Sequence, residues 1–124
     1  MPAQSSKPAG AVYLDRESRL RDLTAMARRA ASALPEIRRI ILFGSHVRGI
    51  PTPRSDADLL VEVAASEDAD PRDRALAVLR AMAPRVCPID LFVYTTAELE
   101  ALEAARSPLV STALREGIDL LERR

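Results

Sequence analysis

The chain has 124 residues, which is enough for one domain of ordinary size and too few for two. Apolar residues make up 48% and charged residues 29% of the sequence, a balance that excludes an intrinsically disordered protein. The 18 basic and 18 acidic residues cancel, so we expect no tight nucleic-acid binding, and no apolar stretch approaches the ~20 residues of a membrane span.

The N-terminal segment differs in composition from the rest of the chain. Residues 1–12 are mostly Pro, Ala, Ser and Gly and have little apolar surface to bury. We therefore expect residues 1–12 to form a flexible tail and residues 13–124 to form the folded domain. The segment also lacks the apolar centre of a signal peptide, so we expect a cytoplasmic protein.

Helical and extended patterns follow in the first half of the domain. Apolar residues recur every three or four positions between Leu14 and Leu34, which predicts an amphipathic helix that ends before Pro35. The runs Ile37–Phe43 and Ala57–Val63 are short and apolar, and we predict that both are strands. Residues 50–54 contain two prolines and are expected to form a loop.

Predicted helices and strands also alternate in the second half of the domain. Apolar spacing predicts a helix from Pro71 to about Met82, and the apolar run Ile89–Tyr94 predicts a third strand. Thr95 is placed to cap the following helix, with Glu98 at the position that completes a capping box.

A last helix is expected from about Pro108 to Glu116, ending at Gly117, with a short strand at Ile118–Leu121. This order of helices and strands predicts an α/β or α+β fold. We expect a small mixed sheet of about three to five strands covered by helices.

Two acidic residues open the strand predicted at Ala57–Val63. Asp56 and Asp58 are two positions apart, so their side chains leave an extended chain on the same face. Carboxylate oxygens at this spacing suit Mg²⁺, which proteins commonly share with substrate phosphates. Asp58 runs directly into Leu59-Leu60-Val61, and an acid beside such a core strand is costly without a partner.

A third acidic residue, Asp90, lies inside the apolar strand Ile89–Tyr94. A neighbouring position for this strand in the sheet would bring Asp90 beside Asp56 and Asp58. Three carboxylates around one or two Mg²⁺ ions are the arrangement used in phosphoryl and nucleotidyl transfer.

The turn after the first predicted strand has groups suited to a phosphate. Gly44 permits a close approach of the backbone, and Ser45 could cap a following helix and bond a phosphate oxygen. A helix beginning near Ser45 would direct backbone N–H groups at a triphosphate, and Arg48 would add positive charge. We interpret His46 as a solvated loop residue rather than a general base, and Cys87 as a buried structural thiol.

These residues together resemble a known signature. The segment GSHVRGIPTPRSDADLLV, residues 44–61, is similar to the motif of the DNA polymerase beta nucleotidyltransferase superfamily. More narrowly, the chain resembles the minimal nucleotidyltransferases, and PIDLFVYTTAELE and REGIDLLE add to the likeness. The resemblance covers roughly residues 37–122 and implies a polymerase-beta-like nucleotidyltransferase fold.

The resemblance also implies roles for the site residues. Asp56 and Asp58 would bind two Mg²⁺ ions, and Asp90 would complete one metal site and help to deprotonate the acceptor hydroxyl. Nucleotide binding is implied for four residues: Gly44, Ser45, Arg48 and Ser55.

The function implied is transfer of a nucleoside monophosphate, AMP from ATP, to a hydroxyl on a partner protein. The chain would act as the antitoxin of a pair with a HEPN-type toxin, whose acceptor would be a tyrosine hydroxyl. Two alternatives stay open at this point: a non-catalytic antitoxin that masks its partner, and a nucleotidyltransferase for small aminoglycoside-type alcohols. A homo-oligomer or a hetero-oligomer is compatible with each.

Overall fold

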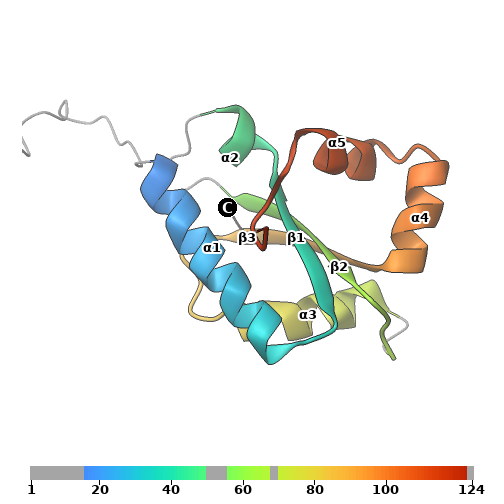
Figure 1. The fold of residues 1–124 in the computed structure, drawn as a ribbon, viewed down its shortest axis with the longest axis horizontal. Helices are drawn as coiled ribbons and strands as arrows, with labels where there is room; N and C mark the ends of the chain where they lie inside the picture. Colours follow the sequence, from blue (N-terminus) through green and yellow to red (C-terminus); the bar gives the residue numbers. More distant parts are fainter. Residues whose placement is uncertain (1–15, 50–55, 68–69, 123–124) are drawn as a thin grey trace, which may run out of the picture.

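The computed structural model describes residues 16–49, 56–67 and 70–122 as a mixed sheet with helices on both faces (Figure 1). The predicted tail at 1–12 and the whole of the proline-containing loop predicted at 50–54 lie outside these ranges, and so does Ser55. None of the helices in the described ranges is long and apolar enough to cross a membrane.

The sheet has four strands in the order β3-β2-β1-β4. Strand β1 pairs antiparallel with both β2 and β4, and β2 pairs parallel with β3, so the predicted mixed sheet is confirmed. The short strand expected near the C-terminus is present but covers only two residues. The strands are β1 (Ile37–Phe43), β2 (Ala57–Val63), β3 (Ile89–Thr95) and β4 (Ile118–Asp119).

The helices cover the two faces of the sheet in pairs (Figure 1). α1 and α3 pack on one face, α4 and α5 pack on the other, and α2 is a single turn directly after β1. The helices are α1 (Arg16–Ala33), α2 (Ser45–Arg48), α3 (Pro71–Met82), α4 (Thr96–Ala104) and α5 (Pro108–Glu116).

Alternate residues of the central strand divide between two hydrophobic clusters. Ile40 and Leu42 belong to the larger cluster with α1 and α3, whereas Ile41 and Phe43 belong to the smaller cluster with α4 and α5. Successive side chains of a strand point to opposite faces, so burial on both sides explains why the strand sequences are almost uninterrupted apolar runs.

Local signals set the helix ends. The Thr95 hydroxyl oxygen accepts a hydrogen bond from the Glu98 backbone N–H at 3.1 Å, and the Glu98 carboxylate accepts one from the Thr95 N–H at 2.9 Å. The predicted capping box is therefore confirmed. At α3, Pro71 is the first helical residue, and the Asp70 carboxylate accepts a hydrogen bond from the Arg72 N–H at 2.9 Å.

Candidate active site

The sheet register brings Asp58 and Asp90 together. They are direct partners on the parallel strands β2 and β3. Asp58 is also the partner of Phe43 on β1, which places its side chain on the α4–α5 face of the sheet. Because partners across a ladder point to the same face, the carboxylate of Asp90 rises beside that of Asp58. The sequence prediction that a neighbouring strand would supply the third acid is confirmed for this pair.

Asp56 is exposed and directly precedes β2. Burial raises the pKa of the Asp58 carboxyl group, and the charges of Asp90 and Asp56 raise it further, while Arg48 lowers it. The three carboxylates therefore lie within each other's electrostatic field. Phe43 and Phe92 belong to the hydrophobic cluster on the same face, and their ring centroids are 6.2 Å apart.

Gly44 holds the backbone of the turn after β1 directly against Asp58. Its φ of +80° lies in the region that favours glycine, and a Cβ at this position would collide with Asp58 Oδ2 and lie 3.2 Å from Cγ. The predicted close approach at Gly44 is therefore present, and the group that approaches is a carboxylate of the protein itself. Together with Asp58 and Asp90, the turn forms one continuous site.

Ser45 begins α2, and its predicted capping role is wrong. Gly44 occupies the cap position of this helix and no side-chain cap bond is formed. Because α2 contains only four residues, it supplies a few backbone N–H groups and not the dipole of a longer helix. Ser45 is exposed, so its hydroxyl is accessible to solvent.

Arg48 lies at the edge of the site, at the other end of α2. Its Nη1 is 3.7 Å from Oε1 of Glu116, the last residue of α5, and 61% of its side chain is exposed. Its charge also lowers the pKa of Asp58. Glu116 was not among the predicted site residues, because only the packing of α5 beside β1 brings it to Arg48.

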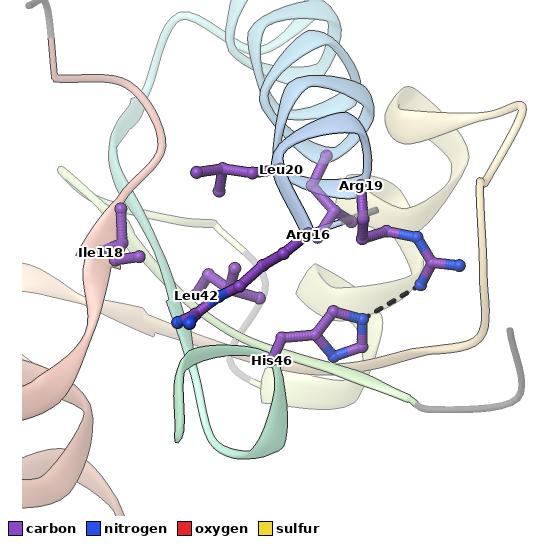
Figure 2. Close-up of a pocket in the computed structure, with 7 residues that line it drawn as sticks. Arg16, Arg19, Leu20, Leu42, His46 and Ile118 are labelled. Atoms are coloured by element: carbon purple, nitrogen blue, oxygen red, sulfur yellow. Dashed lines mark hydrogen bonds between the residues drawn. The ribbon is translucent and has the colours of Figure 1, made fainter. Parts of the chain in front are cut away.

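His46 is buried, so the interpretation of this residue as solvated is wrong. Only 4% of it is exposed, and its ring packs between α2 and the start of α1 (Figure 2). Its Nε2 lies 3.0 Å from Nη1 of Arg19. Burial lowers the pKa of His46, Arg19 lowers it further, and the Asp56 backbone and carboxylate oppose that shift. The signal that sequence reasoning missed was the amphipathic spacing of α1, which brings Arg19 to the inner side of that helix.

Cys87 is a free, buried thiol, as predicted. Burial raises its pKa above the ordinary range for cysteine. A thiol kept protonated is a poor nucleophile, so a structural role fits this residue.

The donor types at the site suit a hard divalent cation. The candidate ligands are carboxylate oxygens, and the raised pKa of Asp58 records a repulsion that a cation would relieve. Within the described ranges, however, no three His, Cys, Asp or Glu side chains are gathered closely enough to hold a metal ion. The residues therefore fit the ion in chemistry and in sheet register, and their side chains need to turn toward a common point.

The comparisons with known proteins agree with this geometry. The nucleotidyltransferase domain family matches residues 25–118. A protein from Sulfolobus solfataricus designated a nucleotidyltransferase has a similar fold, with a TM-score of 0.60 and 19% identity, over 87% of this chain and 84% of that one. No curated protein matches the chain.

Two structures of toxin–antitoxin pairs are also similar. The one determined with AMP-PNP has a TM-score of 0.51 and 22% identity, over 85% of this chain and 74% of that one. The pair MntA–HepT has a TM-score of 0.46 and 19% identity, over 86% and 73% of the two chains. The likeness to the Sulfolobus solfataricus protein and to the structure determined with AMP-PNP concerns the fold.

The family match spans well over half of the sequence and contains the turn at Gly44, the pair Asp56 and Asp58, and the strand that carries Asp90. Sequence motif, strand order and site geometry lead to the same assignment. The chain belongs to the nucleotidyltransferase domain family.

Proposed function

We propose that this protein is a Mg²⁺-dependent nucleotidyltransferase that moves AMP from ATP onto a hydroxyl group of a partner protein. It would act as the antitoxin of a pair whose toxin is of the HEPN type. The observation that carries the proposal is the position of Asp58, which lies between the Gly44 turn and Asp90 with its pKa raised by burial and by the two neighbouring acids. Such repulsion is retained where a cation and a phosphate group are to be bound.

The turn and α2 would hold the triphosphate. Gly44 allows the backbone to approach the phosphates, and the exposed Ser45 hydroxyl can donate a hydrogen bond to a phosphate oxygen. Arg48 would add a charge-assisted contact from the rim of the site. Ser55 is included on the strength of the sequence motif, which places it directly before Asp56.

The acids would hold two Mg²⁺ ions and receive a proton. When bound, Mg²⁺ neutralises phosphate charge and orients the reacting oxygens for an in-line displacement. Asp56 and Asp58 would supply oxygens to both ions, and Asp90 would complete one ion site. Asp90 would also accept the proton of the acceptor hydroxyl as its oxygen attacks the α-phosphorus. The bond from that phosphorus to the pyrophosphate oxygen breaks, and pyrophosphate leaves.

A partner protein is the proposed acceptor. In the described ranges the chain forms one four-stranded sheet with five helices. The similar structure determined with AMP-PNP is described as a toxin–antitoxin, which supports both a nucleotide and a protein partner for this chain. A tyrosine hydroxyl of the toxin is the acceptor we propose.

The experiment is a transfer assay with α-labelled ATP, Mg²⁺ and the product of the neighbouring gene. We expect label on the partner protein with the unaltered chain and none with the double variant Asp56→Asn and Asp58→Asn. Asp22→Asn is the matched control, because Asp22 is an exposed acid on α1. Absence of transfer with folded partner and metal present would contradict the proposal.

The double variant also separates catalysis from masking. If it still binds the toxin and still neutralises it, the protein is a masking antitoxin and not a modifying enzyme. Label transferred to an aminoglycoside but not to the partner would instead support the small-molecule enzyme.

A further inference from the structure

Arg19 and His46 form a buried contact next to the Gly44–Ser45 turn (Figure 2). His46 follows Ser45 in the chain, but its ring points away from the solvent and toward α1. Arg19 is 8% exposed and His46 is 4% exposed. Burying two polar side chains is unfavourable unless they are paired, so the 3.0 Å contact between them is a specific feature of this fold.

The chemistry of arginine fixes the tautomer of the histidine. A guanidinium group has only N–H donors, so Nε2 of His46 must accept the hydrogen bond from Arg19. A neutral ring that accepts at Nε2 carries its proton on Nδ1. His46 therefore presents an Nδ1–H donor on the side of the ring that faces away from Arg19.

That donor is left without a partner of its own among the described residues. Nδ1 is buried and has no well-formed hydrogen bond to any group in the described part of the chain. The Asp56 backbone raises the pKa of the His46 ring, as a nearby hydrogen-bond acceptor does, so the Asp56 carbonyl is the candidate partner for Nδ1. A small movement of the Asp56 carbonyl oxygen toward Nδ1–H of His46 would form a hydrogen bond between them.

The same peptide is held from its other side. The N–H of Ala57, which shares this peptide unit, donates a hydrogen bond to the Pro88 carbonyl at 2.9 Å. Pro88 lies two residues before Asp90. In a trans peptide the C=O and N–H groups point in opposite directions. The Asp56–Ala57 peptide is thus placed between His46 on one side and the start of β3 on the other.

We propose that His46 is a positioning residue for the transfer reaction. Held by Arg19, it directs Nδ1–H at the Asp56 carbonyl and so fixes the separation between the Gly44–Ser45 turn and the carboxylates of Asp56 and Asp58. The inference rests on the proposed function for its chemical meaning. It gives α1 a part in the reaction, because the guanidinium of Arg19 acts on the site through His46.

The first test is the tautomer itself. His46 is the only histidine in the chain, so a long-range ¹H–¹⁵N correlation spectrum of the unaltered protein reports on it without assignment. We expect the pattern of a neutral ring protonated at Nδ1. A ring protonated at Nε2, alone or together with Nδ1, cannot accept from Arg19 and would overturn the proposal.

The second test is metal affinity, measured by electron paramagnetic resonance with Mn²⁺ in the presence of AMP-PNP. Loss of a residue that orients metal ligands typically weakens metal binding about 10–100-fold, and we expect this for Arg19→Met and His46→Leu. The double variant should be no weaker than either single one within about twofold, because the two side chains act as one unit. His46→Gln keeps an oxygen acceptor for Arg19 and should recover affinity to within about threefold.

Arg29→Met is the matched control. Arg29 is another α1 arginine, and it donates to the backbone carbonyls of Met82 and Pro84, at 2.9 and 3.0 Å, at the far end of α3. Its variant should bind Mn²⁺ as the unaltered protein does. Wild-type affinity in folded Arg19→Met and His46→Leu would overturn the proposal. Should either fail to fold, the spectrum of the unaltered protein still decides.

The two proposals fail in different ways. If the unaltered protein binds Mn²⁺ and AMP-PNP, and the His46 variants lose that binding, while no label reaches any partner, the proposed function is wrong and the positioning role stands. If label is transferred and the His46 and Arg19 variants bind and transfer normally, the positioning role is wrong and the function stands.

Discussion

Asp58 on β2 lies directly opposite Asp90 on β3, so two acids face each other across neighbouring parallel strands. Such a pair is unfavourable in the metal-free protein, since burial and both neighbouring acids raise the pKa of Asp58. An acid with a raised pKa contributes stability below its unfolded pKa, near 3.8, and loses it as the pH rises through the folded value. At pH 7 the metal-free protein therefore carries the full repulsion.

Neutralising Asp58 should stabilise the protein and stop the reaction. We expect Asp58→Asn to raise the free energy of unfolding at pH 7 by about 0.5–2 kcal/mol, the usual gain when a strained functional site is relieved. Thermal unfolding in EDTA measures this, and the gain should shrink as the pH falls toward 3.8. Mg²⁺ with ATP should stabilise the unaltered protein more than the variant. A variant less stable than the unaltered chain at pH 7 would contradict this account.

Gly44 should tolerate no side chain. In Gly44→Ala the new Cβ would collide with the Asp58 carboxylate, and the φ of +80° would be strained, so we expect a loss of about 1–3 kcal/mol and no transfer activity. Gly49→Ala is the matched control at the other end of α2. A Cβ there would lie 3.5 Å from the Ser45 carbonyl oxygen at ordinary contact distance, so its effect should be small. Denaturant unfolding of both variants measures the difference.

The ion pair between Arg74 and Glu98 should make stability depend on acid pH. Hydrogen bonding to Arg74 lowers the pKa of Glu98 from 4.5 to about 2. Its contribution is therefore complete above pH 4.5 and is lost as the pH falls toward 2. Because 40% of the Glu98 side chain is exposed, solvent screening reduces the expected loss in Glu98→Gln to about 1 kcal/mol at pH 7.

The glutamine in this variant still accepts the capping bond from Thr95, so the helix end is kept. Glu100→Gln, on the exposed side of α4, should leave stability unchanged. A deficit in Glu98→Gln that stays constant between pH 7 and pH 2.5 would show that packing, not charge, is responsible.

Arg48 should act on the nucleotide and not on the fold. We expect Arg48→Met to raise the KM for ATP about tenfold, as for the loss of one contact to a charged group, with a much smaller change in unfolding temperature. Its side chain is largely exposed and its contact with Glu116 is 3.7 Å long, so little stability depends on it. Arg80→Met, an exposed arginine at the end of α3, is the control for loss of charge alone.

The parts of the fold that were predictable depend on local patterns. The bounds of β1, β2 and α3 agree with the predictions, because the two strands are rich in apolar and β-branched residues and α3 begins at a proline. The pairing of Asp58 with Asp90 does not follow from any local pattern, since only the sheet register brings the two residues together. The spacing of the motif suggested that the two acids lie together, and the parallel pairing of β2 with β3 brings them together.

The residues that were misread depend on contacts distant in sequence. His46 was interpreted as solvated because metal-dependent transfer does not require a histidine there, but Arg19 of α1, 27 residues earlier in the chain, lies 3.0 Å from its buried ring. Ser45 was taken as a helix cap, but the left-handed conformation of Gly44 starts the helix one position earlier. The contact of Glu116 with Arg48 likewise depends on the packing of α5.

The hairpin of β1 and β2 carries most of the candidate site by itself, since Phe43 pairs with Asp58 and the Gly44 turn follows directly. Only Asp90 arrives through the long connection that includes α3. When β3 docks onto β2 during folding, Asp58 and Asp90 therefore come together and their negative charges repel. Divalent cations present during refolding should speed or favour that docking step and leave formation of the hairpin unaffected.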